Sequence, residues 1–112
     1  MEEWTGRMRY AIAFDLDTEK LKTLYGSPYN NAYVEIKKVL EQFNFIGQQG
    51  NLYFGRSEEE NAVKCMFAVQ TLSIDLKWFD KCVKDIRMLR IEDNNDLKPV
   101  LFSNFNKKTT LI

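Results

Sequence analysis

The sequence contains no histidine, which removes the usual proton carrier at neutral pH and the commonest ligand of transition metals. Its two cysteines, Cys65 and Cys82, do not form a Cys-x-x-Cys pattern, so a zinc site is not expected. The chain also lacks a glycine-rich loop of the type that binds phosphates. Catalysis would therefore use carboxylates, an oxygen-bound cation, Lys, Arg, Tyr, Ser, Thr or one of the two thiols.

Net charge is also absent, because 16 basic side chains balance 16 acidic ones. A chain without excess positive charge gives little support to non-specific nucleic-acid binding, although its charges can still gather on one face. The apolar runs are too short to cross a membrane, and residues 1–7 are acidic and lack the apolar segment of a signal peptide. We therefore expect a cytoplasmic protein with no membrane partner.

With 112 residues, of which 45% are hydrophobic and 13% aromatic, the chain is suited to one domain with a packed core. This composition is too rich in aromatic and β-branched residues for a disordered chain. We expect an N-terminal extension at residues 1–8, a single domain at residues 9–105 and a polar tail at residues 106–112.

A central β-strand is predicted from Arg9 to Asp15. Its apolar side chains alternate in size, with Tyr10, Ile12 and Phe14 on one face and Ala11 and Ala13 on the other. We expect the large side chains to meet helices, while the small ones leave room beside the sheet. Asp15 ends this strand, so its carboxylate is held firmly while it faces solvent or a ligand.

Two helices and a hairpin are predicted next. A short helix is expected at residues 17–25, where Asp17 is a candidate N-cap. A longer one begins at Asn30 or Asn31, with an apolar stripe formed by Ala32, Ile36, Val39, Leu40 and Phe43. Gly50 can adopt a positive φ, so residues 45–48 and 51–55 are expected to form a tight hairpin around it.

The second half of the chain predicts another helix and further strands. Ser57 and Glu60 have capping-box spacing and indicate a helix start. The stripe expected to be buried on that helix is Ala62, Cys65, Met66, Val69 and Leu72. A further helical turn at residues 76–82, a strand at residues 83–92 and a short strand at residues 97–105 complete the pattern.

The element order is therefore β-α-β-β-α-β, which predicts an α+β, ferredoxin-like sandwich with an extra C-terminal segment. One antiparallel sheet would carry two helices on one face. Its other face must be polar or covered, and pairing two sheets in a two-fold homodimer is a simple way to cover it.

Four segments in this order resemble the virulence-associated protein D (VapD) family. They are residues 10–16, residues 29–33, Gln49-Gly50 before Leu52-Tyr53, and residues 85–87 with residues 90–92. The resemblance runs from about Met8 to Leu101, which is most of the chain. One departure is Asn51, where family members often have Ser.

This resemblance implies a ferredoxin-like homodimer similar to the small nucleases of CRISPR adaptation. It also implies an endoribonuclease that can act as the toxin of a toxin–antitoxin pair, with RNA as substrate and an antitoxin protein as a possible partner. In such dimers an aspartate at the end of the first strand lies near its symmetry mate, and the matching residue here is Asp15. If the serine hydroxyl of other family members assists catalysis, its replacement by Asn51 puts the rate, or the role of this position, in doubt in this chain.

Two readings of Asp15 follow. It can be a catalytic residue that binds Mg²⁺ or Mn²⁺ together with the same residue of a second chain, or that acts directly as a general base. It can also be a strand-end cap or an ion-pair partner of Arg87 or Arg90. Strand-end acids are common in turns, so the residues alone favour the structural reading, and the resemblance reverses that preference.

The other candidate residues carry similar alternatives. Asp17 can bind a cation but is more simply a helix cap, and Asp85 is a second acidic candidate. Arg87 and Arg90 point to opposite faces of one strand, so only one can bind phosphate at a site, and at least one structural ion pair is expected. Five aromatic residues offer stacking surfaces for unpaired bases, although most are expected in the core or an interface: Tyr10, Tyr29, Tyr33, Tyr53 and Phe54.

The leading hypothesis is a homodimeric endoribonuclease with Asp15 as catalytic carboxylate. A non-catalytic, dimeric protein-binding module is the alternative, and the zero net charge and Asn51 favour it. A third hypothesis is a redox-sensing thiol at Cys82, because Lys81 and Lys84 could lower its pKa.

Overall fold

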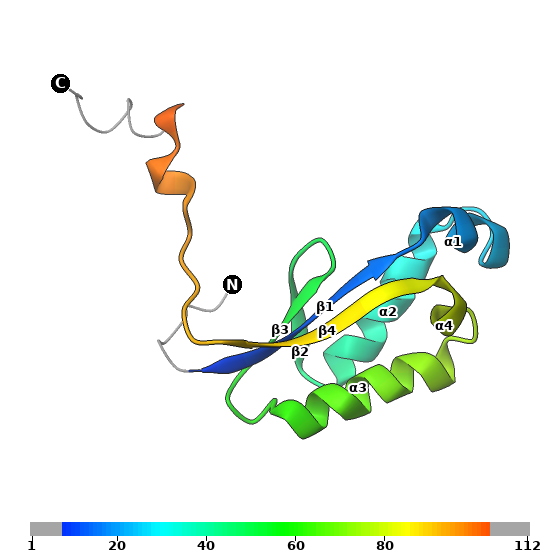
Figure 1. The fold of residues 1–112 in the computed structure, drawn as a ribbon, viewed down its shortest axis with the longest axis horizontal. Coiled ribbons are helices and arrows are strands. Elements are labelled where there is room, and N and C mark those ends of the chain that lie inside the picture. Colours follow the sequence, from blue (N-terminus) through cyan, green and yellow to red (C-terminus); the bar gives the residue numbers. More distant parts are fainter. Residues whose placement is uncertain (1–7, 104–112) are drawn as a thin grey trace.

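Strand β1 (Arg9–Leu16) occupies a central position in the sheet of the computed structural model, which describes residues 8–103 (Figure 1). The sheet is antiparallel, with the strand order β2-β3-β1-β4. Its other strands are β2 (Phe45–Gln49), β3 (Leu52–Gly55) and β4 (Val83–Ile91). The predicted α+β class is confirmed, and the strand order is compatible with a ferredoxin-like fold.

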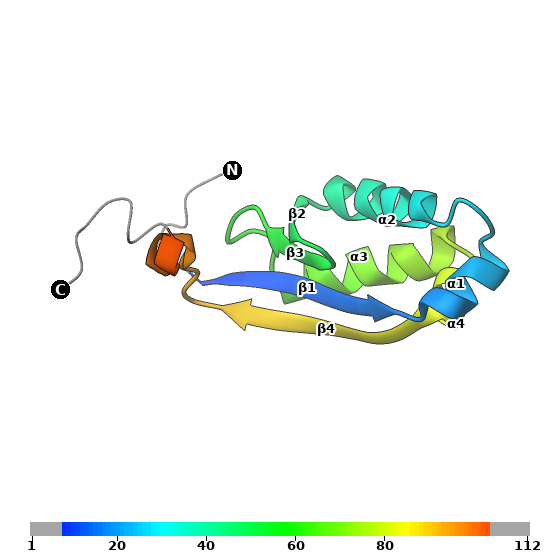
Figure 2. The same cartoon turned by 90° about the horizontal axis from the view of Figure 1, so that it is seen from above.

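The two long helices, α2 (Asn30–Gln42) and α3 (Ala62–Asp75), cover one face of this sheet (Figure 2). Their buried stripes meet the large side chains of β1, so the core forms where the alternation of strand side chains predicts it. Its members include Ile12, Phe14, Ile36, Leu40, Phe45 and Leu72. Two short helices, α1 (Thr18–Leu24) and α4 (Phe79–Cys82), lie beside each other next to the end of β1.

Several local predictions are confirmed. Gly50 adopts a φ of 54° between β2 and β3, in the left-handed region that glycine occupies without strain. The Asp17 carboxylate accepts hydrogen bonds from the backbone N–H groups of Glu19 and Lys20, both at 3.1 Å, and thereby caps α1.

The predicted start of α3 is wrong. The Ser57 hydroxyl donates to the buried Glu60 carboxylate at 2.6 Å, so that carboxylate is engaged with the serine side chain in a turn ahead of the helix. The helix begins at Ala62, and Asn61 caps it by accepting a hydrogen bond from Lys64 N at 3.1 Å. The buried residues of the helix are Cys65, Ala68 and Leu72, and Met66, which was predicted to be buried, is 58% exposed.

The predicted cap of α2 is wrong as well. Asn30 and Asn31 are helical, and Tyr29 occupies the N-cap position without a side-chain hydrogen bond. The preceding Ser27-Pro28 segment leads the chain directly into the helix, where Asn31 N donates to Pro28 O at 3.3 Å. A backbone turn therefore satisfies an N–H group that a side chain was expected to bind.

The C-terminal strand expected at residues 97–105 is not formed in the described part of that range. A 3-10 helix, η1 (Lys98–Val100), stands there instead. Pro99 lacks the N–H group that a strand would donate, and Asp93–Leu97 pairs with no strand of the sheet. Residues 1–7, which make up nearly all of the predicted extension, and the predicted tail at residues 106–112 lie outside the described residues, so those boundaries stay predictions.

Candidate functional site

Asp15 lies directly opposite Asp85 in the pairing of β1 and β4. Its neighbours Phe14 and Leu16 are buried under the helices, whereas Asp15 is exposed, so its side chain projects from the helix-free face of the sheet. Opposed residues of antiparallel strands have Cβ atoms about 5 Å apart, which brings two carboxylates together. The register shifts immediately after this pair, and such bulges often re-aim side chains beside active sites.

Arg87 joins this pair from the same face of β4. Its Nε donates to Asp85 Oδ2 at 2.9 Å, and this bond to a carboxylate raises the pKa of Arg87. The predicted structural ion pair is therefore confirmed, but with Asp85 as the acid. Asp15 forms no ion pair within residues 8–103, so the reading of Asp15 as the ion-pair partner of Arg87 or Arg90 is not borne out there.

Arg90 is separated from this group. It pairs in register with Tyr10, whose side chain lies on the helix-covered side, whereas Arg87 pairs with Ala13 on the other side. The guanidinium of Arg90 forms an ion pair with Glu92 at 3.7 Å. The prediction that the two arginines point to opposite faces is thus confirmed, and only Arg87 shares a face with Asp15.

The turn between β2 and β3 brings Asn51 to the same end of the sheet. Phe14 N donates to Asn51 O at 3.2 Å, which holds this turn against β1 one residue before Asp15. Because the residues come from three separate segments, the site exists only once the sheet has formed. Asp15, Asp85 and Arg87 therefore share one face of the sheet, and the backbone of Asn51 lies beside the end of β1 that carries Asp15.

Tyr33 of α2 is a further neighbour of Asp15. Burial raises the pKa of Tyr33, and the nearby Tyr29 and the Asp15 carboxylate raise it further. Among the other aromatic candidates, Tyr53 and Phe54 are buried and therefore offer no free stacking surface. The sequence named Tyr33 as a candidate for base stacking but did not place it near Asp15.

Few acids are available for a cation within one chain. Asp17 is occupied as the cap of α1, which confirms the structural reading of that residue. Within residues 8–103 no group of three or more His, Cys, Asp or Glu residues is arranged to hold a metal ion. Asp15 and Asp85 alone are too few, so an ion at this place would need ligands from a second chain, RNA or water.

The cysteines do not behave as reactive thiols. Both are buried, and burial raises the pKa of Cys65 to about 11. Burial and the charge of Asp17 also raise the pKa of Cys82, and Lys20 opposes them only in part. The expectation that Lys81 and Lys84 lower this pKa is wrong, because desolvation of the buried sulfur is the largest influence. The redox-sensor hypothesis loses its basis.

The helix-free face of the sheet is apolar next to the acidic site. The register places alternate residues of β1, β3 and β4 on this face. Ala13, Leu52, Leu89 and Ile91 are partly exposed there, whereas Ala11 and Phe54, which point to the same side, are already buried. Arg87 and the two aspartates border this apolar area at the end where β1 stops. An apolar sheet face of this kind favours contact with another surface.

Comparison with known proteins gives the family. No family model matches the chain. Endoribonuclease VapD 2 of Riemerella anatipestifer is 46% identical over 93 residues, which cover 82% of this chain and 98% of that protein. Endoribonuclease VapD homolog of Helicobacter pylori is 47% identical over 92 residues, covering 82% of this chain and 95% of that protein. Endoribonuclease VapD of Dichelobacter nodosus is 42% identical, with coverage of 82% and 96%.

A chain that aligns at this identity with nearly the whole length of such relatives belongs to the VapD family. The resemblance seen in the sequence is thereby confirmed. In the part of the chain that the structure describes, no helix has the length and apolar character needed to span a membrane.

Proposed function

We propose that this protein is an endoribonuclease of the VapD family that works as a homodimer and cleaves RNA beside Asp15. The names of the curated relatives support the activity. The observation that carries the site is the register pair of Asp15 and Asp85 on the exposed face of the sheet, with Arg87 bound to one of them.

The dimer is supported by the apolar, helix-free face of the sheet. Packing this face against the same face of a second copy would cover the partly exposed side chains of Leu52, Leu89 and Ile91 and repeat every contact by two-fold symmetry. The site lies at the border of that face, so each copy would bring its own Asp15 towards the seam. RNA would then bind along the seam, where both copies contribute side chains.

The chemistry assigned to the chain's own residues is proton transfer and charge neutralisation. The Asp15 carboxylate accepts the proton of the attacking oxygen, which belongs to a water molecule or to the RNA 2′-hydroxyl. The planar guanidinium of Arg87 suits the oxygens of a phosphate and neutralises charge as the phosphorus is attacked. Asn51, at the position where relatives often have Ser, offers an amide to the same group. The bond between phosphorus and the leaving ribose oxygen then breaks, and that oxygen takes a proton from water.

A divalent cation fits this site only as a shared ligand. Mg²⁺ or Mn²⁺ prefers oxygen donors, and Asp15 and Asp85 of two copies would supply them together with water. When bound, such an ion polarises a phosphoryl oxygen and favours formation of hydroxide. Asp15 can act as a general base with or without this ion, so the two proposals are tested separately.

The test compares wild type with Asp15→Asn on a labelled single-stranded RNA. Asp75→Asn is the matched control, because Asp75 is an exposed acid at the end of α3, in the helix layer and not on the sheet face that carries Asp15. We expect Asp15→Asn to lose about 100-fold or more of the cleavage rate, as removal of a general base typically does, and the control to retain it. Equal cleavage by both variants removes Asp15 from the mechanism.

The metal is tested in the same assay. Wild-type protein is treated with EDTA, and cleavage is measured before and after Mg²⁺ or Mn²⁺ is restored. Loss and recovery of activity support the shared ion. Cleavage that EDTA leaves unchanged removes the metal and keeps Asp15 as a direct base.

A non-catalytic binding module is the second candidate, favoured by the zero net charge of the chain. A pure preparation that cleaves no RNA but retains a stable protein partner would support it. If the protein acts as a toxin, a co-expressed antitoxin protein should suppress its cleavage of RNA.

A further inference from the structure

A polar groove of about 680 Å³ lies between the short helices α1 and α4. The two helices lie beside each other beyond the end of β1 (Figures 1 and 2). Asp17 N donates to Cys82 O at 2.7 Å, which ties the start of α1 to the end of α4. Val83 lines the groove and pairs with Leu16 of β1. The groove therefore lies next to the strand end that carries Asp15.

Two lysines of this groove have no partner of opposite charge. Lys20 of α1 and Lys81 of α4 are exposed, and neither forms an ion pair within residues 8–103. Burial and the charge of Asp17 raise the pKa of Cys82, and Lys20 opposes them, so the Lys20 ammonium lies close to the end of α4. The two helices thus bring one ammonium group each to the same groove.

The acids of the groove are bound by groups of their own. Glu19 forms an ion pair with Lys22 on α1 at 3.8 Å. Asp80 accepts a hydrogen bond from the Ser73 hydroxyl at 2.9 Å. An anionic ligand in the groove would therefore meet two ammonium groups without ion pairs, while the carboxylates beside them are already engaged.

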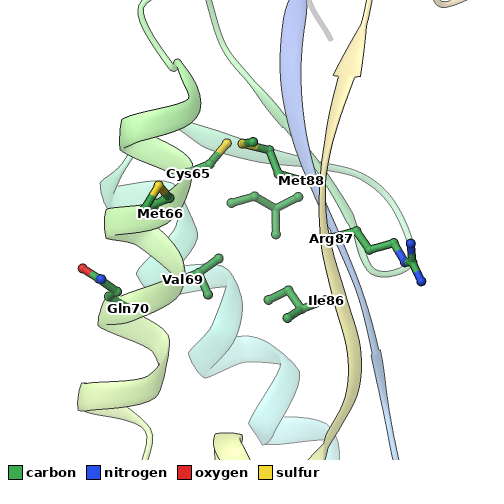
Figure 3. A pocket seen from close by; sticks show the side chains of 8 residues that line it. Cys65, Met66, Val69, Gln70, Ile86, Arg87 and Met88 are labelled. Carbon is green, nitrogen blue, oxygen red and sulfur yellow. The ribbon is translucent and has the colours of Figure 1, made fainter.

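The groove continues the charged end of the sheet. Arg87 points away from the apolar space between α3 and β4 and projects from the sheet face that carries Asp15 (Figure 3). Asp85, which Arg87 binds, lies two residues or about 7 Å of strand after Val83. The exposed Lys84 lies between them in the chain. An RNA strand with one phosphate beside Arg87 would therefore reach the groove within a few nucleotides.

We infer that the α1–α4 groove is a subsite for the phosphate backbone of the RNA substrate, in which Lys20 and Lys81 bind a phosphate next to the cleaved bond. The inference deepens the proposed function, because it rests on RNA being the substrate. The ammonium group of lysine is a compact point charge that suits phosphate and does not read the base. The subsite therefore adds affinity and fixes the position of the strand, whatever its sequence.

Equilibrium binding tests the subsite independently of cleavage. The variant Lys20→Gln/Lys81→Gln is compared with Lys37→Gln/Lys38→Gln, which removes the same charge from exposed positions of α2. The probe is a fluorescent, single-stranded 2′-O-methyl RNA in EDTA, so attack by a 2′-hydroxyl and metal-assisted attack are both blocked. Fluorescence anisotropy at several salt concentrations gives the dissociation constants, and urea unfolding midpoints check that each variant is folded.

We expect the groove variant to bind the probe at least about tenfold more weakly, because each lysine supplies a charged hydrogen bond to phosphate. The dependence of log affinity on log salt concentration should become less steep by about 1.4, which corresponds to two lost contacts with a single strand. The α2 variant should keep both values.

Three results overturn the inference: equal weakening of the two variants, an unchanged salt dependence, or a wild-type chain that does not bind the probe. If the double variant does not fold, Lys81→Gln takes its place, with a change in salt dependence of about 0.7.

The cleavage assay separates this subsite from the reacting groups. The groove variant should raise KM and leave kcat unchanged, because a contact away from the cleaved bond binds substrate and transition state equally. A fall in kcat with unchanged KM would place the two lysines at the reacting phosphate and overturn the subsite. If Asp15→Asn cleaves RNA as fast as wild type, the proposed catalytic site fails, whereas weaker probe binding by the groove variant still supports the subsite.

Discussion

Asp15 and Asp85 face each other across the pairing of β1 and β4, and Arg87 neutralises only Asp85. Like charges directly opposite in a sheet destabilise it, so this arrangement is not one that folding alone would favour. Features that cost stability and persist are typical of functional sites. The exposed Asp15 carboxylate, which costs stability at this position, is the group to which we assign proton transfer.

The two arginines provide a matched test of this arrangement. Arg87→Gln removes the ion pair with Asp85 and the cation next to Asp15, so we expect RNA cleavage to fall strongly. Arg90→Gln removes an ion pair with Glu92 on the other face and should leave the cleavage rate unchanged. Stability should change little in both variants, because the ion pairs are exposed. Steady-state cleavage rates and urea unfolding check the pair, and equal losses of cleavage would contradict the assignment of Arg87.

The core between sheet and helices predicts a large effect at Leu40. This side chain is fully buried on α2, so Leu40→Ala should lower the free energy of unfolding by about 2–5 kcal/mol. Val34→Ala, on the same helix but 48% exposed, is the control and should cost far less. Urea denaturation followed by far-UV circular dichroism measures both. Similar costs at the two positions would contradict the placement of α2.

The structure assigns the cap of α3 to Asn61, whereas the sequence pattern placed the helix start at Ser57. Asn61→Ala should lower the free energy of unfolding by about 1 kcal/mol, because Lys64 N loses its hydrogen-bond acceptor. Asn61→Asp, which preserves an acceptor oxygen, should restore most of this loss. Urea midpoints of the two variants decide the matter. An alanine variant as stable as wild type would show that Asn61 does not cap the helix.

The thiol of Cys65 predicts a dependence of stability on pH. Burial raises its pKa in the folded chain from 9.0 to about 11, so between these values the unfolded chain has lost this proton and the folded chain still holds it. This contribution is fully present below pH 9.0 and is lost as the pH rises through 11. Cys65→Ala should therefore lose less stability than wild type between these values, with a difference of up to about 3 kcal/mol.

Urea unfolding at several pH values measures this difference. All other titratable groups are the same in both proteins, so only the gap between wild type and Cys65→Ala reports the thiol. Parallel curves for the two proteins would contradict the raised pKa of Cys65.

Local patterns in the sequence determined the element order and the inward-facing side chains. The alternation from Tyr10 to Phe14, the stripe of α2, the positive φ of Gly50 and the Asp17 cap were all predictable, because each depends on residues close together in the chain. The acid at the end of the first strand was also visible. The start of α3 was predicted at Ser57 and lies at Ala62, after the Asn61 cap, because the Ser57 hydroxyl and the buried Glu60 carboxylate bond to each other in a turn before the helix.

The tertiary structure alone decided which residues form the site. The sequence places Asp15 and Asp85 far apart, and only the register of β1 with β4 opposes them. The opposite orientation of Arg87 and Arg90 was predictable from their spacing, but only the fold shows that residues 92–103 leave the sheet instead of adding a strand to it. Pairing between distant segments is set by the packing of the whole core, whereas helix periodicity and turn chemistry are written into neighbouring residues.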